Sequence, residues 1–475
     1  MVKNNKNTMK HMQKNYSEDY RDLRDFFEGE RAVKEAGDRH TPRLEGHRKS
    51  GGYEQYVSFG ILYNALARTR QGLKGAILRK PIDVQFPESL MKILDNIMLD
   101  GASFEDVARQ VCDEVIGYGR LGILVDIDEN EQPYVALYDA LSILESKVVG
   151  KDYKVVLKEM VEQPSEDDPD DIELIEQRRK LELNNGIFTV TVYRRSTSLE
   201  HSEFVPVQST PKVPNPRIPK YKGRVLNFVP FTFFGSSSNS AEPSKPPLLD
   251  LLNILKGHWR LTVAYQYGLH FAALPTACFA GFNFEEGKPV PLGPGAVHHT
   301  VDPNAKSWFL QTGGEGLASI EKGLDRLETQ MAVVGARLLE EQRPGVESAE
   351  TVRLRSSGDS STLSDIAGNV ENGLSKVLKH IGFWLGVRDV DCHVSVNKDF
   401  VSTRMSPQDV TALLQAVQAG RISESTFLWN LQQGEILQQG RTIEDEQEAI
   451  GEDRIKNNIN PSGAMASRFL TGTRF

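Results

Sequence analysis

The chain has 475 residues, of which 39% are hydrophobic, and its formal net charge is −9 from 56 basic and 65 acidic residues. This length suits two to four domains or one elongated subunit, and the slightly low apolar share predicts much surface or thin, extended structure. A protein that grips nucleic acid tightly is usually basic, whereas weak phosphate pairing suits a protein past which nucleic acid slides.

Targeting and redox signals are sparse. The cysteines Cys112, Cys278 and Cys392 are far apart and offer no disulfide framework or zinc spacing, which favours a reducing compartment. Residues 1–14 are basic and polar without an apolar core, so a signal peptide is not expected. No apolar run reaches the length of a membrane span, so no membrane partner is expected.

Helical periodicity opens the chain, and strand periodicity follows. Helices are expected at 57–80, 86–98 and 103–116. Ser103 and Asp106 have the spacing of a capping box for the last of these. Strands are then expected at 122–126, 134–138, 153–157, 188–193 and 225–229. The acidic run Glu166–Asp171 lacks the spacing of a calcium loop and is expected to be solvated.

The centre of the chain predicts two long helices that flank a small insert. The first helix is expected at about 248–274 and ends at Pro275. The insert, 276–312, is rich in Gly and Pro and ends in a strand at 308–310. In the second helix, 316–342, apolar residues step by three and four: Leu317, Ile320, Leu324, Leu327, Met331, Val334 and Leu338. Such a narrow seam predicts lengthwise packing on other helices and favours assembly over chemistry.

A polar loop is expected at 343–361, before another helix at 362–385. Arg343, Arg353 and Arg355 alternate in it with acidic residues. The loop therefore reads either as a solvated surface or, if copies of the chain form a ring, as a circle of arginines that touches phosphates. A strand at 392–396, helices at 407–417 and from Ser423, and a loose tail from Asn457 complete the expected elements, listed here in chain order.

Catalytic motifs are weak. Gly117–Gly122 matches GxGxxG, but the run follows a helix and opens a strand, whereas a dinucleotide site has the opposite order. It is therefore expected to be a helix-to-strand turn. The neighbours His298 and His299 lack a third ligand, so no metal site is expected. No cofactor is expected either, and the sequence does not predict an enzyme.

The order of these elements resembles the portal proteins of tailed bacteriophages. The runs that carry the resemblance are Tyr63–Thr69, Arg79–Pro81, Asp100–Glu105, Tyr118–Asp126, Ala273–Pro275, Met331–Leu339 and Ser356–Leu363. The resemblance implies an α+β, mainly helical portal fold with a wing, a two-helix stem, a small β-rich clip and a short helical crown. It divides the chain into wing 1–243, first stem helix 244–275, clip 276–314, second stem helix 315–342, tunnel loop 343–361, wing-crossing helix and strand 362–400, crown 401–456 and flexible tail 457–475.

The resemblance also implies a function. Copies of the chain, twelve in the family, would form a ring at one capsid vertex of the virion, after assembly in the host cytoplasm. The ring would be a channel for packaging and ejecting double-stranded DNA without sequence specificity. Further partners would be the terminase large subunit, the head-completion adaptor, and the major capsid and scaffolding proteins.

Particular residues follow from the same resemblance. The tunnel loop would present Arg343, Arg353, Arg355, Ser356 and Ser357 to DNA. The clip would use Phe284, Lys288, Lys306 and Trp308, and the stem would pack through the seam. Two alternatives stay open: a nucleotide-binding enzyme with an atypical site at Gly117–Gly122, and a scaffold or adaptor that binds only protein.

Overall fold

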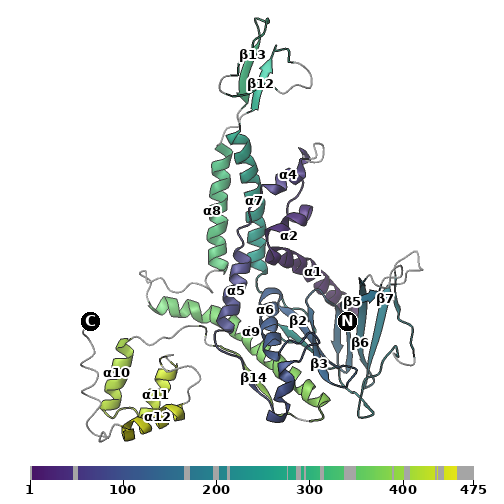
Figure 1. Ribbon diagram of the computed structural model, residues 1–475, viewed down its shortest axis with the longest axis vertical. Coiled ribbons are helices and arrows are strands. Elements are labelled where there is room, and N and C mark those ends of the chain that lie inside the picture. Colours follow the sequence, from purple (N-terminus) through teal and green to yellow (C-terminus); the bar gives the residue numbers. More distant parts are fainter. Residues whose placement is uncertain are drawn as a thin grey trace. The chain divides into compact units, whose positions relative to one another are not determined.

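The computed structural model describes residues 3–46, 52–164, 172–195, 203–210, 214–274, 276–284, 290–293, 296–310, 315–335, 349–387, 390–398, 400, 407–433, 436 and 443–456. The chain is a mixed α/β protein that divides into two compact units, Met1–Lys398 and Asp399–Phe475 (Figure 1). Each unit is a separate body with its own contacts.

Helices dominate the first unit. Its α-helices are α1 Lys3–Glu28, α2 Glu30–Glu35, α4 Tyr53–Ser58, α5 Ala65–Ile77, α6 Phe104–Tyr118, α7 Leu249–Ala273, α8 Glu315–Gly335 and α9 Ala349–Trp384. Two short 3-10 helices are η1 Gly37–Arg39 and η2 Glu88–Asp95. The second unit contains α10 Pro407–Gln418, α11 Glu424–Gln433 and α12 Ile443–Lys456.

Every strand pairing is antiparallel. The largest sheet has the order β4-β5-β6-β7-β8, from Ile143–Val149, Asp152–Pro164, Ile172–Asn184, Ile187–Arg195 and Phe204–Pro206. A second sheet has the order β11-β2-β3, from Phe231–Gly235, Arg120–Ile127 and Pro133–Asp139. The remaining pairs are β1 Asp83–Gln85 with β14 His393–Ser395, β9 Lys220–Tyr221 with β10 Arg224–Val225, and β12 Thr276–Ala280 with β13 Lys306–Leu310.

The core of the first unit lies where α6 and α9 pack on the β11-β2-β3 sheet. Strand β2 is buried along nearly its whole length because it has a strand on each side and helices against it. Gly373 of α9 lets this helix approach the sheet, since a Cβ there would lie 2.3 Å from Cε1 of Phe234. Near the end of α9, Nε1 of Trp384 donates to the carbonyl oxygen of Val125 at 3.3 Å.

A partly buried ion network joins the two larger sheets. Arg179 of β6 pairs with Glu159 of β5 at 2.7 Å and with Asp126 of β2 at 3.3 Å. Asp126 also pairs with Arg217, and the hydroxyl of Tyr138 on β3 donates to Glu159 at 2.5 Å. Because every charge here has an opposite partner, the network fixes how the sheets meet without leaving a buried charge uncompensated.

Several expected elements are confirmed. Helix α6 begins at the predicted capping box, where Ser103 Oγ accepts from the amide of Asp106 at 3.2 Å and the Asp106 carboxylate accepts from the amide of Ser103. Strands β2, β3, β5, β7 and β14 lie at the expected places, as do α7, α10 and α11.

Other expectations were wrong. The helix expected at 57–80 is two helices, α4 and α5, because Gly60 packs on a tryptophan ring and Asn64 caps α5 by accepting from Ala67. The segment expected as a helix at 86–98 is mostly the 3-10 helix η2. The strand expected at 225–229 is displaced, since β10 ends at Val225 and β11 begins at Phe231.

Helix α9 begins at Ala349, not near Thr362 as expected. Residues 349–361 are helical because extending an existing helix fixes one residue per new hydrogen bond, and this offsets the weak helix propensity of the Ser and Gly positions. Strands β4 and β6 were missed because their alternation is blurred by charged residues on the outer face.

The second unit is helical in its described part. Ser423 caps α11, with its Oγ accepting from the amide of Thr426 at 3.1 Å. Helix α11 packs against both α10 and α12, and Leu428 and Leu431 are buried. Across the described part of the whole chain, no helix has the length and apolarity needed to cross a bilayer.

Burial of His380 on α9 should make stability depend on pH. Desolvation, helped by the nearby Lys376, lowers the pKa of His380 from 6.5 to about 3. Below pH 6.5 the unfolded chain therefore binds a proton that the native chain excludes, so the stabilisation present above pH 6.5 is lost as the pH falls. Urea unfolding should show about 1.4 kcal/mol of this loss between pH 7.5 and 5.5.

Replacing His380 by Phe isolates the effect. The ring lies against Phe228, and its Nδ1 is buried without a hydrogen-bond partner, so an apolar ring costs no polar contact there. The His380→Phe chain should be about as stable as the parent at pH 7.5 and should lose about 1.4 kcal/mol less on acidification. An identical loss in both chains would contradict this assignment.

Candidate assembly surface

Helices α7 and α8 form an antiparallel pair in the first unit (Figure 1). The predicted seam is the face of α8 that meets α7: Leu317, Ile320, Leu324 and Leu327 are half-buried and Met331 is buried. Val334 is exposed, and Leu338 lies outside the described residues. The seam thus packs mainly on α7 of the same chain.

Small residues let the two helices approach. A Cβ at Gly268 of α7 would lie 2.7 Å from Cδ2 of Leu317, and one at Gly257 would lie 3.8 Å from Cδ1 of Leu327. A polar contact crosses the same interface, where Nε2 of His258 lies 3.2 Å from Oε1 of Glu328. The pair is therefore a defined packing unit and not two independent rods.

The N-terminal helices brace α7. Trp259 of α7 is fully buried, its Nε1 donates to Oγ1 of Thr41 at 2.8 Å, and its ring fills the space beside Gly60. Farther along α7, the Tyr267 ring meets Tyr56 and Phe59, with centroids 5.0 and 5.8 Å away. These contacts attach α4 and the segment after η1 to α7.

A buried ionic cluster completes this brace. Asp22 and Asp25 of α1 lie beside His40, whose Nε2 is 2.7 Å from Oδ2 of Asp25. These three side chains have the donor types of a metal site, but Lys256 of α7 already pairs with Asp22, and Arg39 pairs with Asp25. Burial lowers the pKa of His40 despite its carboxylate neighbour. The cluster is charge-balanced without an ion and joins α1 to α7.

The β12–β13 hairpin lies beyond the ends of α7 and α8 (Figure 1). Its register pairs Trp308 with Cys278 and Phe309 with Ala277. Trp308, Phe309 and Leu310 are 50%, 64% and 62% exposed. Contiguous exposure of large apolar side chains marks an interaction surface, because burying them against a partner lowers the free energy and leaving them in water does not.

Among the residues predicted for this region, Phe284 is 38% exposed and belongs to a ring cluster with Phe279, Phe282 and His298. Lys306 is the exposed first residue of β13. Lys288 lies outside the described residues. The structure thus brings Phe284, Lys306 and Trp308 into one small substructure.

The predicted DNA-contact residues are divided. Arg343 lies outside the described residues. Arg353, Arg355, Ser356 and Ser357 lie on the first turns of α9 and not in a loop. Positions 353, 356 and 357 share one side of a helix, because they are three and four residues apart, whereas position 355 lies on another side.

The Gly117–Gly122 run is a helix-to-strand turn, as its order predicted. It lies at the C-terminal end of α6, and Gly119 there has a φ of 68°. A Cβ at Gly122 would lie 2.2 Å from the Phe231 ring, so the strand is covered by packing at that point. A phosphate would meet carbonyl oxygens at this helix end and not the free amides of a helix N-terminus.

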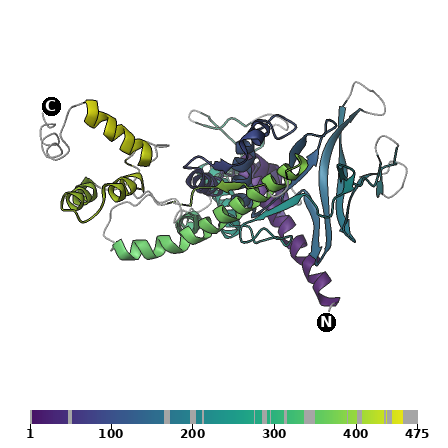
Figure 2. The same cartoon turned by 90° about the horizontal axis from the view of Figure 1, so that it is seen from below.

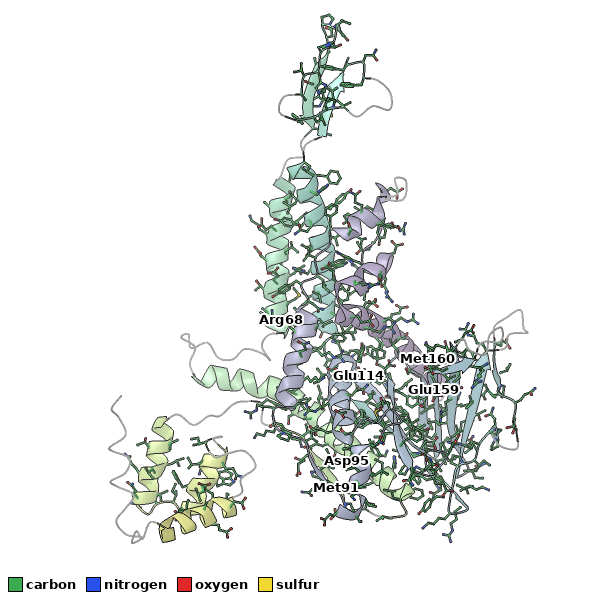
Figure 3. All side chains as sticks on the ribbon, viewed as in Figure 1. Arg68, Met91, Asp95, Glu114, Glu159 and Met160 are labelled. Carbon is green, nitrogen blue, oxygen red and sulfur yellow. The ribbon has the colours of Figure 1, made fainter. Side chains whose placement is uncertain are left out.

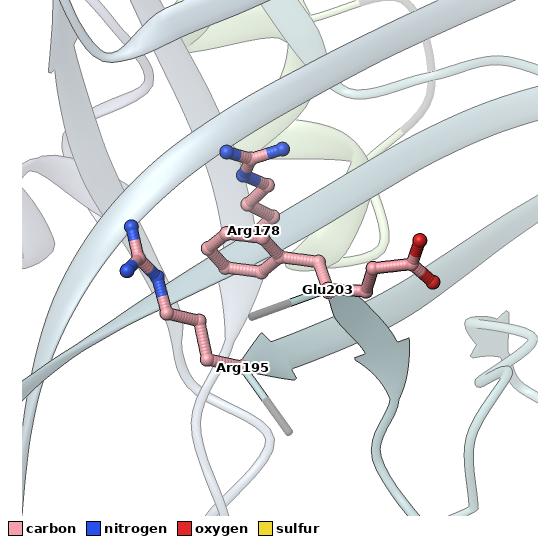
Figure 4. A pocket seen from close by; sticks show the side chains of 4 residues that line it. Arg178, Arg195 and Glu203 are labelled. Carbon is pink, nitrogen blue, oxygen red and sulfur yellow. The ribbon is translucent and has the colours of Figure 1, made fainter. Parts of the chain in front are cut away.

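One concavity lies on the largest sheet, lined by Arg178, Arg195, Glu203 and Phe204 (Figure 4). The guanidinium of Arg178 stacks on the Phe204 ring, with Cζ 3.7 Å from the ring centroid. Cζ of Arg195 is 5.5 Å from the same centroid. The lining thus combines two guanidinium groups, one aromatic ring and the Glu203 carboxylate.

Comparison with known proteins adds three findings. Residues 247–385, which span α7, the hairpin, α8 and α9, match the family model of a domain of unknown function, DUF4055. None of the curated proteins compared with the chain matches it. Among the solved structures that match are chains from gene transfer agent (GTA) particles.

Three of these chains span most of the protein. One, from the neck of a native GTA particle computed with C12 symmetry, has a TM-score of 0.36 and 11% identity over 79% of this chain and 92% of that chain. One from the virion of a native particle has a TM-score of 0.37 and 10% identity over 78% and 91%. One from the neck of an empty particle with C6 symmetry has a TM-score of 0.37 and 10% identity over 76% and 88%.

Sequence reasoning missed the brace of α7, because Trp259 and Thr41 are too far apart in sequence for a local pattern to join them.

Proposed function

We propose that the chain is a portal subunit. Copies of it form a ring at one capsid vertex, a channel through which double-stranded DNA is packaged and ejected. The ring docks the terminase motor and later the head-completion and tail proteins. In this proposal α7 and α8 are the stem, the β12–β13 hairpin is the clip, and the second unit contributes the crown.

One observation carries the proposal: an antiparallel helix pair ends in a hairpin whose Trp308, Phe309 and Leu310 are exposed together. Such a surface needs partners of matching shape, and copies of the same hairpin around a symmetry axis supply them. The braces at Trp259 and at Asp22 support the pair from one side, which suits a subunit that bears load.

Contact with DNA is proposed for the first turns of α9. A channel that lets a duplex slide needs sparse basic contacts, because each phosphate that a basic side chain neutralises adds affinity for the DNA. A continuous basic lining would therefore hold the duplex in place. Arg353 and Arg355 lie on different sides of these turns, so together they supply only a sparse basic contact per copy. The acidic balance of the chain fits the same requirement.

Arg353→Glu combined with Arg355→Glu tests the channel. The variant should still assemble, but DNA packaging in the parent phage should fall by at least about tenfold, because like charge is then presented to the phosphates. The pair Lys147→Glu with Lys151→Glu, on exposed positions of β4 and of the turn that follows it, is the control of equal charge change. Unchanged packaging in the arginine variant would contradict the DNA contact.

A nucleotide-binding enzyme is disfavoured by the closed packing at Gly122 and the wrong helix end. Titration of the purified chain with nucleotide should show no saturable binding. A protein-only scaffold or adaptor would assemble through the hairpin as well, but its packaging role would not depend on Arg353 and Arg355.

A further inference from the structure

The tip of the largest sheet is a two-stranded ribbon. The ladder between β4 and β5 ends at Leu157, and the ladder between β6 and β7 ends at Gln177. Beyond these points, and among the residues that the structure describes, β5 and β6 pair only with each other, up to Pro164 opposite Ile172. We call residues 159–164 and 172–176 the acidic ribbon. Both of its edges are open, and an isolated ribbon of this kind is only marginally stable in water.

One face of the acidic ribbon carries three exposed apolar side chains beside Glu162 and Glu176. Met160, Ile172 and Leu174 are 53%, 62% and 65% exposed. They share a face because Met160 pairs with Glu176, Glu162 with Leu174, and Pro164 with Ile172. Glu159, the neighbour of Met160 in Figure 3, points to the other face, where it pairs with Arg179.

The ribbon also concentrates the charge of the chain. Between Glu159 and Glu176 the sequence has nine acidic residues and no basic one, so its formal charge equals the −9 of the whole chain. Five of the nine belong to 165–171, outside the described residues, and the docking surface is defined by the described ribbon alone. Glu159 already pairs with Arg179, and Glu176 lies 3.6 Å from Arg178 and 3.8 Å from Lys158, so Glu162 is the carboxylate on this face that a basic, partly apolar partner would meet.

The start of this chain has that chemistry. Residues 1–17 contain four lysines and no acidic residue. Within α1, positions 3, 6, 10 and 14 are all lysine and fall on one side of the helix, since they recur every three and four residues. Positions 9, 12 and 16, two methionines and a tyrosine, share an adjacent side. We call residues 3–14 the basic arm.

The length of the basic arm and the direction in which it extends both agree with a contact between copies. The basic arm spans about 16 Å at 1.5 Å per residue, and residues 159–164 of β5 span about 17 Å. Figure 2 shows the first turns of α1 extending away from the other helices of the first unit. A continuous helix cannot turn back on itself, so the arm reaches outward from the body of its own chain.

We propose that the basic arm of one copy docks on the acidic ribbon of a neighbouring copy, with its methionine side on Met160, Ile172 and Leu174 and its lysines beside the ribbon's carboxylates. The inference rests on the proposed ring, which places identical copies side by side. It adds a second contact between subunits, distinct from the hairpin. Because arm and ribbon are different surfaces, the contact is head-to-tail and is satisfied for every copy only when the ring closes.

Single-cysteine chains test the docking. A tagged Lys10→Cys chain is mixed with a Leu174→Cys chain of different mass, assembled, and mildly oxidised. Any disulfide between these two positions then joins two copies. A Val225→Cys chain, whose replaced residue is exposed elsewhere in the first unit, takes the place of Leu174→Cys as the control, and the parent chain measures the background from native cysteines.

The Lys10–Leu174 pair should give a two-chain product well above the control. Adding Lys3→Glu, Lys6→Glu and Lys14→Glu to the arm should lower the yield by about tenfold, and Glu162→Lys on the partner should restore part of it. Yield equal to the control, or a disulfide that forms only when both cysteines lie in one chain, overturns the inference.

Failure of the proposed docking can be distinguished from failure of the proposed ring. If particles form but this crosslink does not, the docking falls and the ring stands. If no particles form, the ring falls, and the crosslink at high concentration still decides the docking. If the lysine-to-glutamate changes in the basic arm abolish DNA retention while no crosslink forms, the arm binds nucleic acid and the inference is wrong.

Discussion

Replacing Trp259 by Ala should lower the free energy of unfolding of the first unit by about 3–5 kcal/mol, the largest loss expected from a single truncation in the described core. The side chain is fully buried, and its ring fills the space beside Gly60. Truncation leaves a cavity between α7 and the N-terminal helices, and it leaves the buried Thr41 hydroxyl without its donor.

Urea unfolding of the unassembled chain measures this loss. Trp308→Ala is the matched control, because the same side chain is removed from a position that is 50% exposed. Its effect on unfolding should stay within about 0.5 kcal/mol. Similar losses for Trp259→Ala and Trp308→Ala would show that Trp259 does not hold the brace together.

Replacing both Trp308 and Phe309 by Ser should abolish assembly while leaving the subunit folded. Both side chains are exposed in the single chain, so folding does not depend on their burial. If neighbouring copies cover them, each contributes about 1.5–3 kcal/mol to every interface. Losing both should weaken association by at least about a hundredfold.

Sedimentation over a range of concentrations measures this effect. Leu99→Ser, which removes a 73% exposed side chain away from the hairpin, is the control and should assemble like the parent. Circular dichroism separates lost assembly from lost folding. A Trp308→Ser, Phe309→Ser chain that assembles as tightly as the parent would show that the hairpin is not the contact.

Elements that depend on interactions between residues close in sequence were predicted correctly. The Ser103–Asp106 capping box fixed the start of α6, and the three-and-four stepping of Leu317 to Met331 identified the face of α8 that packs. The glycine run at Gly117 was recognised as a turn because motif order, and not only motif composition, decides where a helix amide can point.

Distant contacts decided what the sequence could not show. The break between α4 and α5 exists because Gly60 meets Trp259, a residue far along the chain. The Asp22–Lys256 pair joins residues separated by 234 positions. The run Trp308–Leu310 looks like a buried strand by composition, and only the fold reveals that no other described element covers it. These are the positions at which tertiary structure overrides local preference.

Electron microscopy of the purified, full-length chain tests the central claim most directly. The account predicts closed rings of many copies with a central opening wide enough for a DNA duplex, and a particle mass that is a whole-number multiple of 53.1 kDa. Particles that remain single chains at high concentration, or that form open filaments or solid aggregates without a central opening, would contradict it.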